Sequence, residues 1–508
     1  MTIRPTPTQR IVLERPRRAT VDLDVSELYD GAALLIAHGY RIALIAGHDD
    51  GDGSLRVVYL FVDGPPDQRV ELQVRVSTDE PRLASLANFS FPAGRFEREL
   101  QDLFGLEPVG HPQPRSLVRH QHWDAQWFPH RKDAGVQPDM IHDAAPYPFA
   151  TIEGTGIYEI PVGPVHAGVI EPGHFRFWVV GETIVKMKAR LWFVHKGIER
   201  LFEGRDETAA LALSERVSGD SAIGHSLAHC LAVEEALGVE VSARTGELRA
   251  VLLELERLYN HVADVGALCN DAGFSLANAR ALTLRERLLR LNERVSGHRL
   301  LRGALGYGAV NLQSLPRPEE LHEVATQFRE IVDLARANTI LMDRFRGTGV
   351  LNQVQARDIG VLGVTARASG LNFDARHAHP FFDTDASFQA VTRDGGDVLS
   401  RFEVRCDEVE ASLTLLGDLI SREGSLTVTS TESVTPHEGH GTGIVEGWRG
   451  AVVHRVEFSS SGELSRVKIV DPSFPTWPAL AIALSDTIVP DFPLVNKSFN
   501  LSYAGNDL

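Results

Sequence analysis

Apolar and polar residues alternate along several short segments of the first third of the chain. The alternation is clear over residues 41–46, 55–62 and 70–77, and residues 21–39 combine a strand edge with a helical pattern that stops at Gly39. A period of two predicts strands with one buried face, and a glycine after a helical pattern is typical of a helix C-terminus. We therefore expect residues 1–145 to form an α/β sandwich domain.

A second alternating region lies between residues 163 and 204 and contains the signal of a β-hairpin. Apolar residues alternate on both sides of a Gly-Glu turn at residues 181–182; they are Phe175, Phe177, Val179, Val185, Met187 and Ala189. The loop ahead of this hairpin holds His166, Glu171 and His174 among glycines and prolines. Imidazoles and a carboxylate on such a loop suit proton handling better than core packing, so we expect a proton-handling pocket here.

After the hairpin the pattern changes to a helical period. Apolar residues recur at helical spacing over residues 207–217, 222–237, 244–268, 279–295, 319–343 and 402–422. Long helices of this kind pack into a bundle, with ligand sites in its core or at its end. Residues 134–155 are rich in Ala, Pro, Gly and Asp and predict a linker. We expect an α+β protein whose second domain, residues 146–508, is a mainly helical bundle with peripheral β-hairpins.

Composition limits the partners and the location of the chain. The formal net charge of −17 argues against binding to nucleic acid or to an anionic lipid surface. No apolar run reaches the roughly 20 residues of a membrane span, and the first residues lack the apolar centre of a secretory signal. We therefore expect a cytoplasmic protein that reaches a membrane only through partner proteins.

Cysteine and histidine positions bear on metal binding. Cys230, Cys269 and Cys406 are far apart, and an iron–sulfur cluster normally needs four thiolates, so we expect no cluster in this chain. His225 and His229 have the i, i+4 spacing of metal ligands on a helix, but no glutamate completes a zinc motif. We favour a structural histidine pair over a metal site.

Several motifs recur in an order that resembles two related protein families. They are His-Lys-Gly-Ile-Glu at residues 195–199, Arg-Val-Ser-Gly-Asp-Ser at 216–221, Arg-Ala-Ser-Gly at 367–370, Glu-Gly-Trp-Arg-Gly at 446–450 and Asp-Pro-Ser at 471–473. These blocks resemble the large subunits of membrane-bound energy-converting nickel–iron hydrogenases, of the formate hydrogenlyase and hydrogenase-4 type. They also resemble the quinone-site subunit of respiratory complex I.

The segment from residue 96 to residue 133 carries a further resemblance. Its Glu-Arg-Glu at residues 97–99, Asp102, Phe-Gly at 104–105 and Gly-His-Pro at 110–112 are similar to the small hydrophilic subunit that adjoins the quinone-site subunit in complex I. The resemblance implies a fusion of two subunits that are separate chains in many relatives. From the residues themselves, we expect the charged side chains of residues 97–102 to form a solvated or docking face of a short helix.

The resembling hydrogenases hold their nickel–iron centre with two CxxC pairs. By this resemblance the early pair corresponds to Ser218 and Ser221, and the late pair to Ser473 and Thr476. A neutral hydroxyl does not replace a thiolate on a soft, redox-active metal. We therefore expect no nickel–iron centre, and we take these four positions, with His225, as the candidate cofactor-binding lining of a former metal pocket.

In the resembling complex I subunit, a histidine on the hairpin loop and a tyrosine on the following helix reach the quinone headgroup. The resemblance gives the loop role to His166 or His174, and both alternatives stay open. It places His229 at the tyrosine position. A histidine can donate a hydrogen bond or a proton to a carbonyl oxygen, although its pKa near neutrality changes the proton chemistry.

Arg367 and Asp374 belong to a block that both families share. A loop arginine beside a glycine can reach into a cavity and stabilise an anionic intermediate. Equally, Asp374 and Arg376 can form a structural ion pair. We keep Arg367 and Asp374 as candidate catalytic residues. A Gly-rich stretch at residues 436–443 lacks the lysine of a nucleotide-binding loop, and we expect a flexible loop there.

Together these features predict a subunit of a membrane-associated oxidoreductase. It would pass electrons from an iron–sulfur partner to a quinone or a similar acceptor, coupled to ion translocation by integral membrane partners at the cytoplasmic face of the inner membrane. NADH oxidation would belong to partner subunits, because no dinucleotide-binding fingerprint is present. An alternative is a non-catalytic scaffold that transmits protons or conformational change. An active hydrogenase is the function that the sequence favours least.

Overall fold

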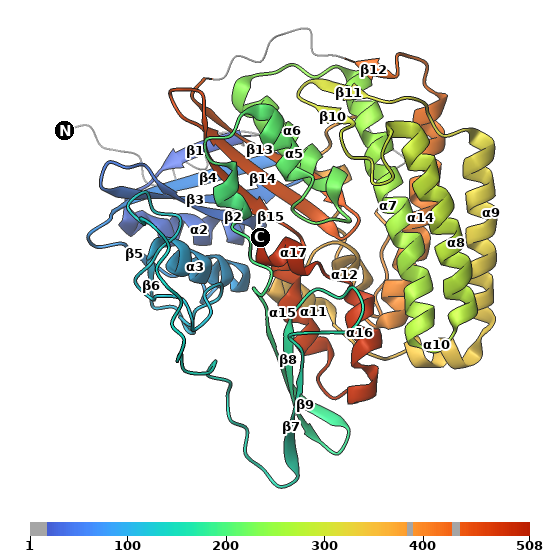
Figure 1. Cartoon of the computed structure of the whole chain (residues 1–508), viewed down its shortest axis with the longest axis horizontal. Coiled ribbons are helices and arrows are strands. Elements are labelled where there is room, and N and C mark those ends of the chain that lie inside the picture. Colours follow the sequence, from blue (N-terminus) through green and yellow to red (C-terminus); the bar gives the residue numbers. More distant parts are fainter. Residues whose placement is uncertain (1–17, 384–389, 429–436) are drawn as a thin grey trace. The chain divides into compact units, whose positions relative to one another are not determined.

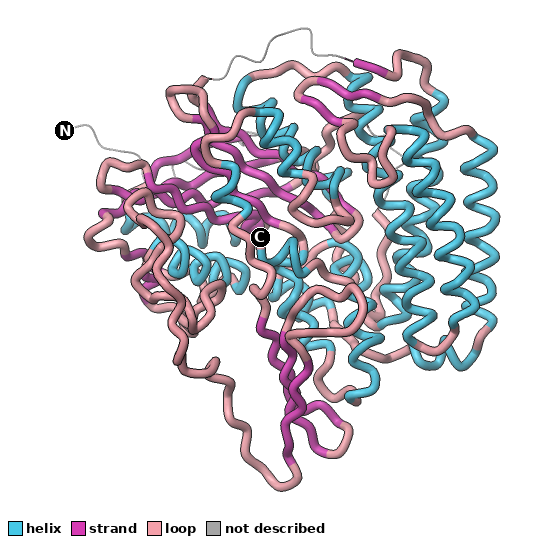
Figure 2. Tube along the Cα trace, viewed as in Figure 1, coloured by secondary structure: helices cyan, strands magenta, loops and turns pink. Residues whose placement is uncertain are grey.

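The computed structural model describes residues 18–383, 390–428 and 437–508. The chain forms two compact units: the first comprises residues up to 152 with 191–195 and 507, and the second comprises residues 153–190, 196–506 and 508. Both units contain helices and strands, which confirms the expected α+β class (Figure 2).

The first unit is built on a four-stranded sheet with the order β1-β4-β3-β2. Its strands are β1 (Arg18–Asp22), β2 (Arg41–Asp49), β3 (Ser54–Asp63) and β4 (Gln68–Ser77); β1 pairs with β4 in parallel and the other pairs are antiparallel. Two helices, α2 (Leu28–Ala37) and α3 (Phe91–Phe104), pack on this sheet, and β5 (Arg82–Ala84) pairs with β6 (Glu107–Val109). The alternating segments of the sequence correctly predicted β2, β3 and β4.

The charged residues of α3 are internal, so the expected solvated face is wrong. Glu97 is 4% exposed and accepts hydrogen bonds from the Ser85 hydroxyl and the Leu86 backbone amide. Asp102 is fully buried, and its carboxylate accepts the backbone amides of residues 117–119 and the Arg119 guanidinium. The carboxylates face inward because they supply the acceptors that the backbone of residues 85–86 and 117–119 lacks.

The second unit begins with an antiparallel sheet of β7 (Ile157–Val162), β8 (His174–Val180) and β9 (Thr183–Arg190). The hairpin of β8 and β9 matches the sequence pattern. The sequence pattern missed β7, because its exposed tyrosine, glutamate and proline at residues 158, 159 and 161 weaken the alternation.

A second antiparallel sheet consists of β13 (Gly439–Gly447), β14 (Gly450–Phe458) and β15 (Leu464–Val470). The helix α6 (Ala222–Leu237) packs along β13, at a distance that only glycine permits: a Cβ at Gly443 would lie 1.9 Å from the Ala228 carbonyl oxygen. The sheet, α6 and the short helices α4 (Ile198–Phe202) and α5 (Glu207–Ser214) enclose an apolar core. The Gly-rich stretch is therefore a strand from residue 439 onward, not a loop; residue 436 lies outside the described residues.

A bundle of four long helices forms another part of the second unit (Figure 1). The helix α7 (Ala243–Asp271) contacts α8 (Ser275–Ser296) and α14 (Val398–Ser421), and α9 (Pro318–Ala337) contacts both α8 and α14. The segment predicted as one helix over residues 319–343 is two, because Asn338 leaves the helical conformation and caps α10 (Thr339–Phe345) by accepting the Leu341 amide.

Short elements complete the second unit. They are β10 (Leu305–Gly306), β11 (Ala309–Asn311), β12 (Thr427–Val428), α11 (Gln353–Ile359), α12 (Gly363–Ala368), α13 (Ala375–Ala378), α15 (Ser473–Ala483), α16 (Phe492–Phe499) and α17 (Tyr503–Asp507). Within the described ranges, no helix combines the length and the apolar character needed to cross a membrane.

Candidate functional site

The two candidate histidines of the β7–β8 loop bind backbone carbonyl groups of that loop. His166 Nε2 lies 2.8 Å from the Gly173 carbonyl oxygen, and His174 Nδ1 lies 3.0 Å from the Gly163 carbonyl oxygen. Gly163 has a φ of +75°, and a Cβ there would lie 2.2 Å from the Gly173 oxygen, so the base of the loop requires glycine. Each histidine thus joins the beginning of the loop to its end.

The rest of this loop is largely exposed. Val165, Val169 and Ile170 are 87%, 101% and 57% exposed, while the Glu171 carboxylate accepts the Ala504 backbone amide at 3.0 Å. The loop therefore has an anchored base and an apolar tip that faces away from the core of the unit. Three neighbouring exposed aliphatic side chains are the kind of surface that contacts another apolar group.

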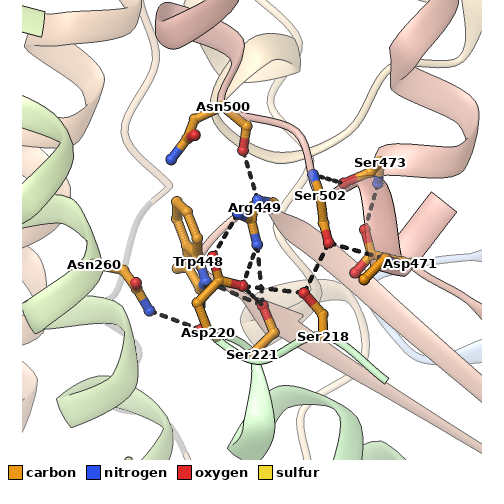
Figure 3. A network of polar contacts seen from close by, with 12 residues as sticks. Ser218, Asp220, Ser221, Asn260, Trp448, Arg449, Asp471, Ser473, Asn500 and Ser502 are labelled. Carbon is orange, nitrogen blue, oxygen red and sulfur yellow. Dashed lines mark hydrogen bonds and ion pairs between the residues drawn. The ribbon is translucent and has the colours of Figure 1, made fainter. Parts of the chain in front are cut away.

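Ser218 and Ser221, the positions of the early cysteine pair, flank Asp220 just before α6 (Figure 3). The Ser218 hydroxyl donates to Asp220 Oδ1 at 3.1 Å and lies 2.8 Å from the Ser502 hydroxyl. The Ser221 oxygen accepts the indole N–H of Trp448 at 3.1 Å. Both serine hydroxyls are buried and hydrogen-bonded by the protein itself.

Arg449 crosses this pocket and binds Asp220 through two parallel hydrogen bonds. Its Nη1 and Nη2 atoms lie 2.7 Å from Asp220 Oδ1 and Oδ2, its Nε donates to the Asn500 carbonyl oxygen at 2.6 Å, and its guanidinium stacks 3.8 Å above the Trp448 ring. The pairing lowers the pKa of Asp220 against the opposing effect of burial. The Asp220 side chain keeps 41% of its surface exposed and that of Arg449 only 7%, so Asp220 is the solvent-facing member of the ion pair.

The late pair of positions lies at the start of α15, on the other side of the pocket. The Ser473 hydroxyl oxygen accepts the Ser502 backbone amide at 2.9 Å, which brings Ser473 next to the partner of Ser218. Thr476 Oγ1 donates to the Pro472 carbonyl oxygen and accepts the Leu362 backbone amide. Tertiary structure thus brings the early positions and Ser473 together, with Thr476 one turn further along α15.

These residues do not fit a nickel–iron centre. The four candidate positions offer neutral hydroxyl oxygens, each already hydrogen-bonded within the protein, whereas a soft redox-active metal takes thiolates. Among the described residues, no group of three or more His, Cys, Asp and Glu side chains has the geometry to hold a metal ion.

A line of buried histidines adjoins the pocket. His225 Nε2 lies 3.1 Å from Asp471 Oδ2, and its Nδ1 lies 3.0 Å from His454 Nε2. His229, one turn after His225, is fully buried with its ring 5.9 Å from the His454 ring and 5.2 Å from the Phe202 ring. Burial lowers the pKa of His229 to about 3 and holds the pKa of His454 well below its usual value, so both rings are neutral.

Arg367 and Asp374 belong to a group of seven charged side chains that we call the buried charge cluster. Its members, each at most 4% exposed, are Arg257, Arg367, Arg376, Glu254, Asp374, Glu408 and Glu446. Arg376 binds Asp374 through two hydrogen bonds and also contacts Glu408 at 2.8 Å. Arg367 contacts Glu408 at 2.9 Å and Glu446 at 2.7 Å. Arg367 is therefore surrounded by carboxylates, and the Asp374–Arg376 pair that the sequence offered as an alternative is present.

Some residues that complete the pocket belong to motifs of the sequence, and others do not. Arg449 lies in the Glu-Gly-Trp-Arg-Gly block and Asp220 lies between the two early positions, so both belong to motifs that the sequence shows. His454 and Ser502 were missed. Nothing local marks them, because each is 229 or more residues from its partner along the chain.

Comparisons with known proteins identify the family and the fold. The model of the respiratory-chain NADH dehydrogenase 49 kDa subunit family matches residues 271–438, and that of the 30 kDa subunit family matches residues 22–139. One chain of a solved structure, the archaeal membrane-bound sulfane sulfur reductase (a respiratory membrane complex), has a similar fold. The match covers 71% of the present chain and 100% of the reductase chain, with a TM-score of 0.64 and 24% sequence identity.

Two relatives match nearly the whole length. Hydrogenase-4 component G of Escherichia coli is 31% identical, over 97% of this chain and 89% of the relative, and formate hydrogenlyase subunit 5 of the same organism is 32% identical, over 93% and 86%. An NADH-quinone oxidoreductase subunit of Phocaeicola vulgatus, designated C/D, is 29% identical, over 80% and 83%. This chain therefore belongs to the family of fused 30 kDa and 49 kDa subunits that serve complex I-like and hydrogenase-related membrane complexes.

Proposed function

We propose that this chain passes electrons from an iron–sulfur partner to a quinone or a similar small acceptor within a membrane-bound, complex I-like oxidoreductase. Integral membrane partners would translocate ions, and the chain would lie at the cytoplasmic face of the inner membrane through its partners. No nickel–iron centre and no iron–sulfur cluster of its own take part in this proposal.

The observation that carries the proposal is the Asp220–Arg449 ion pair, in which a nearly buried guanidinium is held by a partly exposed carboxylate. A guanidinium held rigidly by a carboxylate offers a fixed positive charge and charge-assisted hydrogen bonds to the oxygen of an acceptor that becomes anionic on reduction. The Asp220 side chain is 41% exposed, so an acceptor can approach the pair without unfolding the pocket.

The β7–β8 loop supports the same function in a second way. Its exposed Val165, Val169 and Ile170 suit the apolar tail of a quinone, and His166 and His174 are held at the base of the same loop. We keep His166 and His174 as candidates for proton delivery. His229 is a weaker candidate, because it is fully enclosed and its pKa of about 3 keeps it neutral.

A second candidate function is a scaffold that transmits protons or conformational change without its own redox step. The observation in its favour is that the hydroxyl groups of Ser218, Ser221, Ser473 and Thr476 are all hydrogen-bonded internally. A pocket filled by its own polar contacts needs no cofactor for its stability.

Reduction of a water-soluble quinone analogue by membranes that contain the assembled complex tests the proposal. Arg449→Met is expected to lower the rate at least tenfold, because it removes the fixed cation at the acceptor, whereas Arg287→Met is expected to leave the rate unchanged. Arg287 is the matched control because it forms an exposed ion pair with Glu323 on the helix bundle.

Equal rates for wild type and Arg449→Met, with equal amounts of assembled complex, would refute the acceptor site and favour the scaffold. Nickel analysis of the purified wild-type complex runs in parallel. Stoichiometric nickel bound by this subunit would contradict the expectation that hydroxyl ligands hold no such centre.

A further inference from the structure

The buried charge cluster carries one more negative charge than positive charge if all its members are ionised. Three guanidinium groups face four carboxylates, and each of these side chains is at most 4% exposed. The neighbouring Arg405–Asp264 pair adds no net charge, and the adjacent His261 is neutral because burial and the nearby arginines hold its pKa well below the usual value. An unbalanced charge in a dry interior is costly, so the cluster as a whole favours one bound proton.

Contacts with arginine indicate which carboxylate holds that proton. Glu408 contacts Arg257, Arg367 and Arg376, and although burial opposes ionisation, these three cations hold its pKa well below the usual range. Such a carboxylate stays ionised. Two further members are also well paired: Asp374 binds Arg376 twice, and Glu254 contacts two arginines and accepts the Ser412 hydroxyl.

Glu446 has the weakest cationic surroundings of the four. Its Oε1 accepts Arg367 Nη1 at 2.7 Å, and its Oε2 accepts the Ala375 backbone amide at 2.9 Å and no other donor among the described residues. The same Arg367 nitrogen lies 3.5 Å from Asp374, so two carboxylates share one guanidinium. When two acids share a site, the acid with fewer opposing charges keeps the proton, and burial and Asp374 together raise the pKa of Glu446.

Glu446 lies near the end of β13, beside the turn at residues 448–449 that carries Arg449. We call residues 446–450, the end of β13 with this turn and the start of β14, the turn of residues 446–450; Arg257 Nη1 donates to its Gly447 carbonyl oxygen at 2.7 Å. The turn fits tightly against α12, since a Cβ at Gly363 would lie 1.9 Å from the Arg449 carbonyl oxygen. One short, closely packed turn therefore connects the buried charge cluster to the Asp220–Arg449 pair.

We propose that Glu446 is a buried proton-binding carboxyl group that keeps its proton at neutral pH, and that the turn of residues 446–450 couples its proton affinity to the Asp220–Arg449 pair. The second part rests on the function proposed above: reduction of an acceptor at Arg449 adds negative charge near the turn, which strengthens proton binding at Glu446. The charged groups in direct or electrostatic contact with Glu446 are Arg257 from α7, Arg367 from α12 and Asp374, which caps α13. Glu254, Arg376 and Glu408 belong to the same cluster, and His261 and Arg405 adjoin it.

Infrared spectroscopy of the full chain in its complex tests the first part. A protonated carboxyl group has a carbonyl stretching band that moves in heavy water, and at neutral pH Glu446→Gln is expected to lose one such band. Glu286→Gln is the control, because Glu286 lies outside the cluster on α8 and its pairing with Arg299 and Arg290 lowers its pKa to about 2; it is expected to lose a carboxylate band instead. Loss of a carboxylate band in Glu446→Gln would overturn the proposal.

Glu446→Gln can also impair folding, because the amide nitrogen of a glutamine cannot accept a hydrogen bond from the Ala375 backbone amide. If Glu446→Gln does not fold, the double variant Glu97→Gln/Glu256→Gln, with glutamate isotope-labelled, replaces it. Among the described residues, that variant removes two further buried glutamates whose pKa burial raises, and a labelled protonated-carboxyl band is expected to remain. Its absence would overturn the proposal.

The coupling is tested by titrating the same band in Arg449→Met. Loss of that cation leaves Asp220 unneutralised, so the pH at which the Glu446 band disappears is expected to rise, while Arg287→Met leaves it unchanged. An unchanged titration in Arg449→Met would refute the coupling but not the proton site. If wild-type membranes reduce no acceptor, the proposed acceptor function is wrong, and the infrared result still shows whether Glu446 holds a proton.

Discussion

His229 occupies an apolar niche on α6 beside Phe202, and within the described residues neither of its ring nitrogens has a hydrogen-bond partner. Burial lowers its pKa to about 3, against an ordinary value of 6.5. Between pH 6.5 and pH 3, therefore, the unfolded chain binds a proton at this residue and the folded chain does not. Stability is thus lost as the pH falls from 6.5 towards 3, by an amount on the order of 4 kcal/mol over the whole window.

His229→Leu removes the titrating group and also the two unsatisfied nitrogens. We expect its melting temperature to fall less steeply than that of the wild type between pH 7 and pH 5, with equal or higher stability at pH 7. His377→Gln is the control, because it removes an exposed histidine and leaves the interior unchanged. Equal slopes for wild type and His229→Leu in scanning calorimetry would show that the buried ring does not control acid stability.

At the scale of secondary-structure elements, the main feature is the close packing of α6 on β13. Glycines alternate along β13, and Ala228, Ala232 and Ala236 recur every fourth residue along α6. A Cβ added at Gly443, Gly441 or Gly439 would lie 1.9, 2.2 or 2.5 Å from the carbonyl oxygen of one of these alanines, in the same order. The two patterns lie in distant parts of the sequence. Each is readable alone as a small-residue period, yet only the fold shows that they face each other.

Gly443→Ala is expected to destabilise the protein by about 1–3 kcal/mol or more, because the new methyl group meets a backbone carbonyl that cannot rotate away. Gly417→Ala on α14 is the matched control: nothing lies within 4 Å of its Cβ position, and the higher helix propensity of alanine is expected to stabilise the helix by about 0.5–1 kcal/mol. Denaturant unfolding measures both. A Gly443→Ala variant as stable as Gly417→Ala would contradict the close packing of α6 on β13.

For the whole molecule, attachment to a membrane is expected to depend on partner subunits. The described residues contain no helix suited to crossing a membrane, and the net charge of −17 disfavours binding to anionic lipid. We predict that the chain expressed without its partners is released from membranes by an alkaline carbonate wash, whereas in the assembled complex it sediments with them. Retention of the isolated chain after the wash would indicate a membrane anchor of its own.

The sequence by itself determined the α+β class, the longest helices, the strands of the first sheet and the family, because these depend on local periodicity and on motifs that remain contiguous. The resemblance also assigns Ser218, Ser221, Ser473 and Thr476 to the positions of the two CxxC pairs of the resembling hydrogenases, which stays a prediction. The sequence did not predict that the acidic residues of α3 are buried, because a helical charge pattern does not show which backbone amides need acceptors.

Only the tertiary structure decided what surrounds the candidate residues. It joined Ser218 to Ser502, His225 to His454 and Arg367 to Glu446, pairs that are 284, 229 and 79 residues apart. Hydrogen bonding and charge pairing in a buried site depend on distances of a few ångströms, and no local pattern encodes such distances between remote segments. The excess carboxylate of the buried charge cluster became visible only when all seven side chains could be placed together.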